Sequence, residues 1–160
     1  MKILDCHSRS EDRVARALSN LHPYPFDFDG VRCGSIEGFL QSLKFPDLEE
    51  QGAVATLAGK EAYFTGQHGN GWQEEQILYW RGKKFPRTYK KYQTLLTQAY
   101  DACFEQNEDF IVALIESGNA ILTHDMGKTN PAKTVLTPME YTLQLYRLRA
   151  RAQQMLEDDV

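Results

Sequence analysis

The chain has 160 residues, of which 42% are hydrophobic and 25% are charged, and its formal net charge is −4. This size and composition predict one globular domain over residues 1–160, with residues 1–17 as an N-terminal extension. The lack of an overall basic excess argues against a tight duplex binder, and no apolar run approaches the ~20 residues of a membrane-spanning helix.

The first part of the chain predicts short elements. Residues 2–4 fit a short strand, and the charged stretch over 10–16 fits a short helix capped by Ser10. Residues 26–33 alternate around an Asp-Gly pair, which is typical of a small hairpin.

The middle of the chain predicts mainly helices. Residues 48–61, which are rich in small side chains, indicate one helix, and 66–71 form a glycine-rich loop. Residues 72–80 fit a further short helix, and 82–86 are a basic break after it.

The second half has the strongest helical signals. Apolar residues keep helical spacing over 89–104, where Thr88 is the expected cap, and a shorter helix is expected over 108–116. Residues 120–123 fit a short strand, and a Thr-Pro-x-Glu start at Thr137 predicts the last helix. The whole pattern predicts a mainly α fold with a few short β-strands (α+β).

The most informative segment for function is the run over 35–45. Read as a helix that starts after Ser35 and stops before Pro46, it has two faces. One is an apolar stripe that consists of Ile36, Phe39, Leu40 and Leu43. The other aims Glu37, Gln41 and Lys44 along a single side, over about 10 Å of helix axis. Glycosidic chemistry needs such groups facing one pocket, and a solvated helix face is the alternative.

The same segment and its neighbours resemble the NADAR (YbiA-like) superfamily. The matching motifs, in the order of that family, are Leu18-Ser19-Asn20-Leu21, Pro25-Phe26, Asp29-Gly30, Ser35-x-Glu37, the helix with Phe39, Gln41, Lys44 and Phe45, Gly59-Lys60, and Ala120-Ile121-Leu122-x-His124. The resemblance extends from about Leu18 to about Arg149 and implies a YbiA-like single-domain helical fold.

The resemblance also implies an activity. Members of this family cleave ribose–base N-glycosidic bonds, in ADP-ribose attached to guanine or in ribosylamino-pyrimidine intermediates of riboflavin synthesis. The resemblance implies that Glu37 is the acid/base and that Lys44 is the amine that forms a ribose–lysine imine. The expected substrate-binding residues are Ser19, Asn20, Gln41, His124 and Asp125.

The chain departs from the family after His124. The Trp-Gly pair that the family has there does not occur in the short segment 125–133. Either Asp125 replaces the acidic residue of that loop, or the pocket has diverged. The alternatives to an enzyme are an inactive nucleotide or ADP-ribose binding module and an interaction protein on the same scaffold.

Two further groups have a functional and a structural interpretation. The basic cluster of Lys83, Lys84, Arg87, Lys90 and Lys91 is either a solvated face or a surface that attracts phosphate or nucleic acid. The aromatic residues Trp72, Tyr79 and Trp80 either stack on a base or belong to the core.

The cysteines and the start of the chain bear on the compartment. Cys6, Cys33 and Cys103 are scattered, with no CxxC spacing, and Asp5 interrupts the first apolar residues. A reducing cytoplasm is therefore expected. We expect no cofactor and no metal, and a nucleotide or ADP-ribose-type small molecule, or ADP-ribosylated nucleic acid, as the partner.

Overall fold

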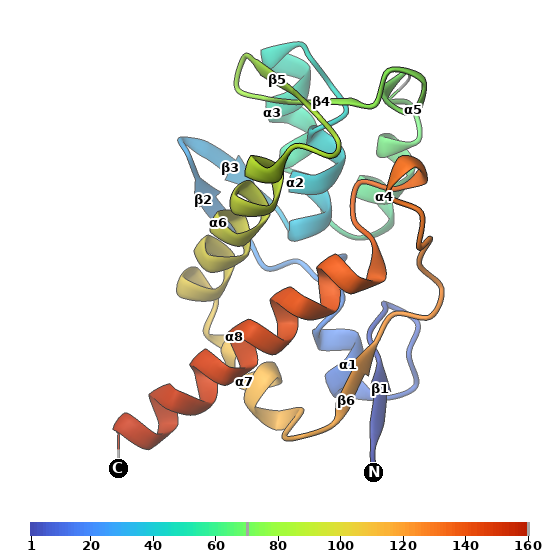
Figure 1. Cartoon of the computed structure of the whole chain (residues 1–160). Helices are drawn as coiled ribbons and strands as arrows, with labels where there is room; N and C mark the ends of the chain where they lie inside the picture. The colour runs from blue at the N-terminus through green and yellow to red at the C-terminus, as the bar shows by residue number, and fades with distance from the viewer. Residues whose placement is uncertain (70, 160) are drawn as a thin grey trace.

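The computed structural model describes residues 1–69 and 71–159, and helices dominate them (Figure 1). The helices are α1 (Arg13–Ala17), α2 (Ile36–Ser42), α3 (Leu48–Ala55), α4 (Gly59–Gly66), α5 (Trp72–Glu75), α6 (Lys90–Gln106), α7 (Glu108–Glu116), the 3-10 turn η1 (Pro131–Lys133) and α8 (Pro138–Asp158). The strands are β1 (Ile3–Asp5), β2 (Phe26–Phe28), β3 (Val31–Cys33), β4 (Ile77–Trp80), β5 (Lys83–Pro86) and β6 (Ile121–Thr123). The expected mainly helical α+β class is confirmed. Asn70, in the expected loop over 66–71, lies outside the described residues.

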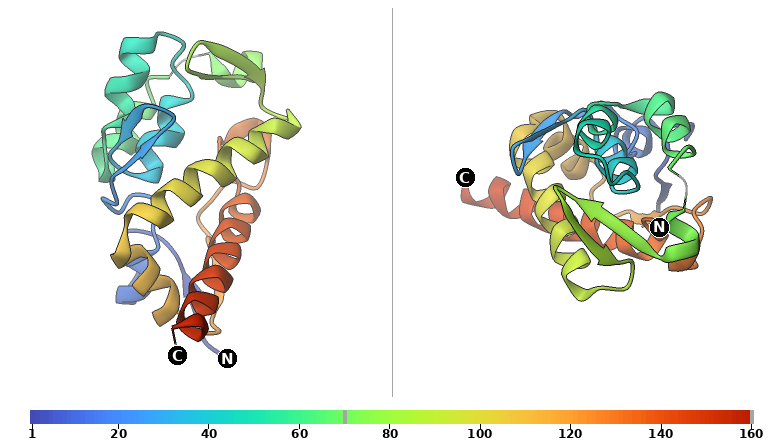
Figure 2. Two further views of the ribbon diagram at one scale, coloured as in Figure 1. Left: turned by 90° about the vertical axis from the view of Figure 1, so that its left-hand side faces the viewer. Right: turned by 90° about the horizontal axis from the view of Figure 1, so that it is seen from above.

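The strands form three separate pairs around the helices. β1 pairs in parallel with β6, whereas β2–β3 and β4–β5 are antiparallel hairpins. The β1–β6 pair lies at the end of the molecule where the chain starts and finishes, and the β4–β5 hairpin lies at the other end with α3 and α5 (Figures 1 and 2). The N-terminal residues are thus an integral part of the domain rather than an appendage.

Helix α2 lies in the core, and every one of its residues is buried. Its start is as expected, because the Ser35 hydroxyl accepts a hydrogen bond from Gly38 N at 2.9 Å. A Cβ atom on Gly38 would lie 2.4 Å from Leu57 O, so only glycine allows the chain after α3 to come this close. The side of α2 that carries Glu37 and Gln41, its polar stripe, is therefore not a solvated face.

The helix expected over 48–61 is two helices, which corrects the sequence prediction. Gly59 has a φ of +60° at the start of α4, and its N–H donates to Leu21 O at 2.9 Å. A left-handed residue cannot continue an α-helix, so the chain turns there. The turn directs α4 toward α2.

The short helix expected over 72–80 is also corrected. Helix α5 ends at Gln76, whose φ is +57°, and the chain continues as the β4–β5 hairpin. The hairpin turn has positive φ at both Arg81 (49°) and Gly82 (83°), which is the conformation that matches the twist of two-residue hairpins.

Two of the expected caps differ and one is confirmed. Asp12 rather than Ser10 caps α1, with its carboxylate accepting from Val14 N at 2.8 Å. Tyr89 rather than Thr88 occupies the cap position of α6. The capping box at the start of α8 is present: Thr137 and Glu140 satisfy each other's backbone N–H groups. Within the described residues, no helix combines the length and apolarity needed to span a membrane.

Candidate functional site

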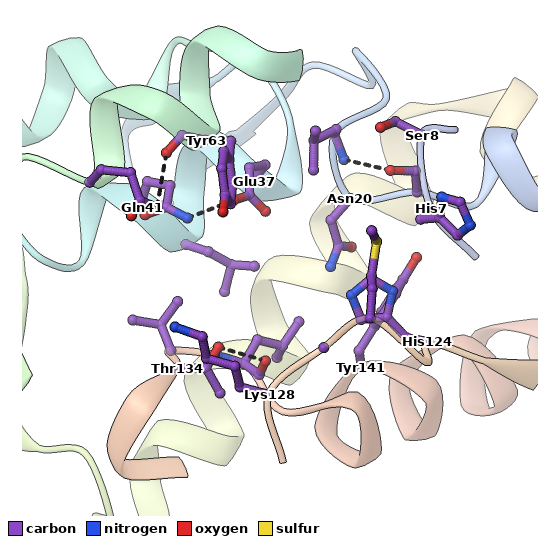
Figure 3. Close-up of a pocket in the computed structure, with 18 of the residues that line it drawn as sticks. His7, Ser8, Asn20, Glu37, Gln41, Tyr63, His124, Lys128, Thr134 and Tyr141 are labelled. Carbon is purple, nitrogen blue, oxygen red and sulfur yellow. Dashed lines mark hydrogen bonds between the residues drawn. The ribbon is translucent and has the colours of Figure 1, made fainter. Parts of the chain in front are cut away.

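A cavity of about 520 Å³ lies between α2, α4 and the segments that flank β1 and β6 (Figure 3). It is lined by Ser19 and Asn20, by Glu37 and Gln41 of α2, by Lys44, which lies two residues after the end of α2, and by His124. The structure therefore brings six of the seven expected site residues to one cavity. A volume of this order is typical of pockets for small ligands.

Glu37 is the acidic group of this cavity. Its side chain is 8% exposed, and its Oε1 accepts a hydrogen bond from Gln41 Nε2 at 2.6 Å. Burial raises the pKa of Glu37, and the hydrogen bond from Gln41 and the nearby charge of Lys44 only partly oppose this effect. A carboxyl group in this environment favours its protonated form and can act as a general acid.

Lys44 has the complementary shift. Its Nζ donates to Gly66 O at 3.3 Å, where the end of α4 packs against α2. Burial lowers the pKa of Lys44, the negative charge of Glu37 opposes this effect, and the positive charge of Lys128 adds to it. The result is a larger fraction of neutral amine, which is the nucleophilic form.

The Ser19–Leu21 segment forms a wall of the cavity. Its backbone is held by hydrogen bonds from α2 on one side and from α4 on the other. Asn20 O accepts from Glu37 N at 2.9 Å, and the start of α4 bonds to Leu21 O. The hydroxyl of Tyr100 donates to Asn20 Oδ1 at 2.8 Å, which sets the orientation of the amide. The Asn20 amide nitrogen, which forms no hydrogen bond with the described residues, is a donor toward the cavity (Figure 3).

His124 lies at the end of β6 and faces the cavity. Its Nδ1 lies 2.8 Å from Cys6 O, and its ring packs edge-on against Tyr141 at 5.1 Å. Since a carbonyl oxygen only accepts, Nδ1 carries the proton, and in the neutral ring Nε2 is left as an acceptor.

The structure does not bring Asp125 to the cavity, which corrects the expected site. Asp125 is exposed, and its N–H donates to Asp5 Oδ1 at 2.8 Å. Gly127 N donates back to His124 O at 3.2 Å, so the chain turns sharply there, and Asp125 is not among the residues that line the cavity. Asp125 therefore does not replace the acidic loop residue of the resembled family in the cavity.

No pattern in the sequence indicates the positive charge of the site. Five basic side chains line the cavity, from four different segments: Arg9, Lys44, Lys60, and Lys128 with Lys133. Glu37 is the single carboxylate among the described lining residues. A chain with a net charge of −4 thus concentrates cations at this cavity, which favours an anionic ligand.

The basic cluster over 83–91 is not part of this site. Arg87 is 2% exposed, and its guanidinium donates to both carboxylate oxygens of Glu140, at 2.7 and 3.2 Å. It is therefore a structural ion pair, which corrects its expected place in a surface cluster. Lys83 and Lys84 are exposed on β5 and do not line the cavity.

The two tryptophans have different roles. Trp80 belongs to the core, where it packs against Phe28 and Phe39 and donates from Nε1 to Asp29 Oδ2 at 2.9 Å. Trp72 is 5% exposed and lines the cavity. Trp72 thus provides an aromatic surface that the sequence alone could not separate from core packing.

Comparisons with known proteins agree with this picture of the fold. A family model described as bacteriophage protein GP30.3 matches residues 12–150. A 17.1 kDa protein encoded in the Gp30–rIII intergenic region of Enterobacteria phage T4 is 34% identical over 134 residues, which cover 83% of this chain and 88% of that protein. The solution structure of Escherichia coli YbiA superposes with a TM-score of 0.59 at 18% identity, covering 99% of this chain and 89% of YbiA. The YbiA-like fold that the sequence resemblance implied is therefore confirmed.

Proposed function

The chain belongs to the bacteriophage GP30.3 protein family, and on its YbiA-like fold we propose that it is an N-glycosidase of the NADAR type. It cleaves the bond between ribose and a nitrogen base in a phosphorylated or ADP-ribosylated nucleotide. The observation that carries this proposal is the pairing, in one cavity, of a buried carboxyl group on Glu37 with a partly buried amine on Lys44. The cations around them suit the phosphates of such a substrate.

The number of carboxylates favours a role for the amine. Glycoside hydrolysis by two carboxyl groups needs a second Asp or Glu across the scissile bond. Among the described residues that line the cavity, Glu37 is the only Asp or Glu, and Asp125 is not one of them. Lys44 is the group that can act as the nucleophile in place of the second carboxylate.

The proposed reaction uses these two residues in sequence. The neutral amine of Lys44 attacks C1′ of the ribose while the bond from C1′ to the base breaks, and Glu37 protonates the leaving base. The cationic nitrogen of the ribosyl-lysine gives a proton to the Glu37 carboxylate, and the C1′–O4′ bond opens as O4′ takes up a proton, which gives the protonated imine. Water then hydrolyses the imine, which restores the amine and releases the free sugar; this sugar is ADP-ribose when the substrate is ADP-ribosylated. In this proposal Asn20 and Gln41, which line the cavity, orient the sugar hydroxyls.

Trapping tests this reaction directly. Borohydride added during turnover of an ADP-ribosylated guanine substrate should reduce the imine and leave the reduced ADP-ribosyl group on wild-type protein, which mass spectrometry locates at Lys44. Lys44→Arg keeps the charge but cannot form an imine, so it should show neither the adduct nor turnover. Full turnover by Lys44→Arg would refute the covalent reaction.

One observation favours a binding module as the second candidate. The amine of Lys44 is hydrogen-bonded to Gly66 O, which anchors it to α4. In a binding module this contact would be permanent and the cavity would hold the nucleotide intact. Tight binding of ADP-ribose without turnover of any ribose N-glycoside would establish this alternative.

A further inference from the structure

The mouth of the cavity carries three large apolar side chains that the proposed reaction does not use. Tyr63 and Phe64 of α4, and Met126 after β6, line the cavity with 46%, 59% and 54% of their surface exposed. Figure 3 shows Tyr63 on one side of the cavity and Lys128, close to Met126 in the chain, on the other. Single exposed apolar side chains are common, but several at one place mark a contact surface.

Helix α4 presents one face to the protein and another to the cavity. Gly66 faces α2, since a Cβ atom on it would lie 1.8 Å from Gln41 Oε1. On the cavity side, Lys60, Tyr63 and Phe64 follow the i, i+3, i+4 spacing. The two aromatic rings pack edge-on with centroids 5.4 Å apart, so they form one exposed aromatic surface beside an exposed lysine.

The cavity separates two properties that a nucleoside also separates. The ribose hydroxyls need hydrogen-bonding partners, which Asn20 and the buried Gln41 supply in the interior. The flat base needs an aromatic ring on which to stack. Trp72 and Tyr141 also line the cavity, but both are buried and offer a ligand little ring surface. The exposed rings that suit a base are therefore those at the mouth.

We propose that Tyr63 and Phe64 bind the leaving base by stacking at the mouth of the cavity, while the ribose occupies the polar interior. The inference rests on the proposed function and goes beyond it by assigning the orientation of the substrate. The leaving group is then a planar aromatic ring rather than an aliphatic amine.

This orientation also sets the order of release. Once the bond from C1′ to the base is broken, the base lies at the mouth and leaves first, while the sugar is still attached to Lys44. Its departure gives water a path to the imine, which is the next reactant in the proposed reaction.

Binding measurements test the inference without any need for turnover. Isothermal titration calorimetry compares guanosine 5′-monophosphate with ribose 5-phosphate, which has the same sugar and phosphate without the base. The nucleotide should bind wild-type protein about tenfold more tightly because its base stacks. Equal affinities for the two probes would overturn the inference.

Variants of α4 then locate the gain. The double variant Tyr63→Ala and Phe64→Ala should lose the tenfold gain and keep the wild-type affinity for ribose 5-phosphate. Leu143→Ala on α8 is the matched control, because Leu143 is 60% exposed and does not line the cavity. This control should keep the whole gain, whereas a gain that survives the double variant would place the base elsewhere.

A second double variant covers the case in which the alanine variant does not fold. Tyr63→Leu with Phe64→Leu keeps large apolar side chains at both positions and removes only the rings, so it should also lose the gain. A full gain in this variant would overturn the inference.

Turnover of ADP-ribosylated guanine on the same samples separates this inference from the proposed function. The expected binding pattern without turnover by wild-type protein would refute the glycosidase and leave the stacking site as part of a binding module. Turnover without that binding pattern would refute the stacking site alone.

Discussion

At the scale of single residues, Glu37 is a position where the proposed catalytic role has a cost in stability. Its carboxyl group is buried and accepts one side-chain hydrogen bond, from Gln41. Because burial raises its pKa, the folded chain holds this proton more tightly than the unfolded chain does. The stability that this proton provides is complete below the unfolded pKa and is lost as the pH rises through the higher folded pKa.

Glu37→Gln should therefore stabilise the protein at neutral pH and abolish most of its activity. The amide keeps the shape without the cost of a buried charge, so the melting temperature should exceed that of wild type near pH 8, and the difference should vanish near pH 4. Turnover should fall by about 100- to 10,000-fold because the proton donor is lost. Calorimetry at both pH values and a steady-state assay check the two effects, and an unchanged turnover would assign Glu37 to helix electrostatics.

Arg87 illustrates a residue whose role the sequence could not indicate. Burial alone would raise the pKa of Glu140, but its bonds to Arg87, Thr137 and Gln93 outweigh burial and lower that pKa. Arg87→Ala would leave this carboxylate in a poorly solvated place, so we expect a loss of about 3–5 kcal/mol in the free energy of unfolding. Lys84→Ala, at an exposed position in the same basic stretch, should change it by less than about 0.5 kcal/mol. Urea unfolding of both variants separates them, and equal small effects would contradict the structural role of Arg87.

The candidate site was predictable only where a local pattern defined it. Helical spacing alone predicts that Glu37, Gln41 and Lys44 share one side of the run over 35–45, because three and four residues bring side chains back to the same face. The same spacing could not say whether that face meets solvent or a cavity. Lys128 and Lys133 come from an irregular segment, where sequence carries no periodic signal, so only the tertiary fold reveals them.

At the scale of elements, the site depends on the close approach of α4 to α2. A Cβ atom on Gly66 would lie 1.8 Å from Gln41 Oε1, and one on Gly69 would lie 2.6 Å from Lys44 Cβ. Glycines at these two positions let the end of α4 cover the polar stripe of α2. The contact holds Lys44 through its hydrogen bond to Gly66 O.

Gly66→Ala should therefore damage the site more than helix propensity would suggest. The new methyl group must displace Gln41, which disturbs its bond to Glu37, so we expect lower melting temperature and at least tenfold weaker ADP-ribose binding, about 1.4 kcal/mol. Gly52→Ala in α3 is the matched control, because no atom lies within 4 Å of its new Cβ and it should stabilise the helix by up to ~1 kcal/mol. Equal behaviour of the two variants would mean that α4 can move away from α2 at no cost.

The elements that the sequence mispredicted share one cause. The break at Gly59 and the end of α5 at Gln76 both depend on a left-handed residue, and small or polar residues are compatible with helix as well as turn. The alternating Ile77–Trp80 segment is too short for its period to be distinguished from a helix turn. Long helices such as α6 and α8 were predictable because many turns repeat the same pattern.

At the scale of the whole molecule, the fold places distant segments around one cavity. The parallel pairing of β1 with β6 brings the segment after Cys6 next to His124, a link that no local pattern encodes. Helix α8 closes this side, where the hydroxyl of Tyr141 donates to Leu18 O. The cavity is thus a product of long-range contacts, and its integrity reports on the folding of the entire chain.

The distribution of charge over the molecule gives the last prediction. Lys128 and Lys133 line the cavity, whereas Lys83 and Lys84 lie on the β4–β5 hairpin outside it. Replacing both Lys128 and Lys133 by alanine should weaken ADP-ribose binding about tenfold at low salt and less at physiological salt, where exposed charges are screened over about 8 Å. The double variant Lys83→Ala and Lys84→Ala removes the same net charge, so it controls for the overall field and should bind as wild type does at both salt concentrations. Titration calorimetry of the two double variants at two ionic strengths makes the comparison. Equal losses in both would mean that total charge, rather than the cations at the cavity, attracts the substrate.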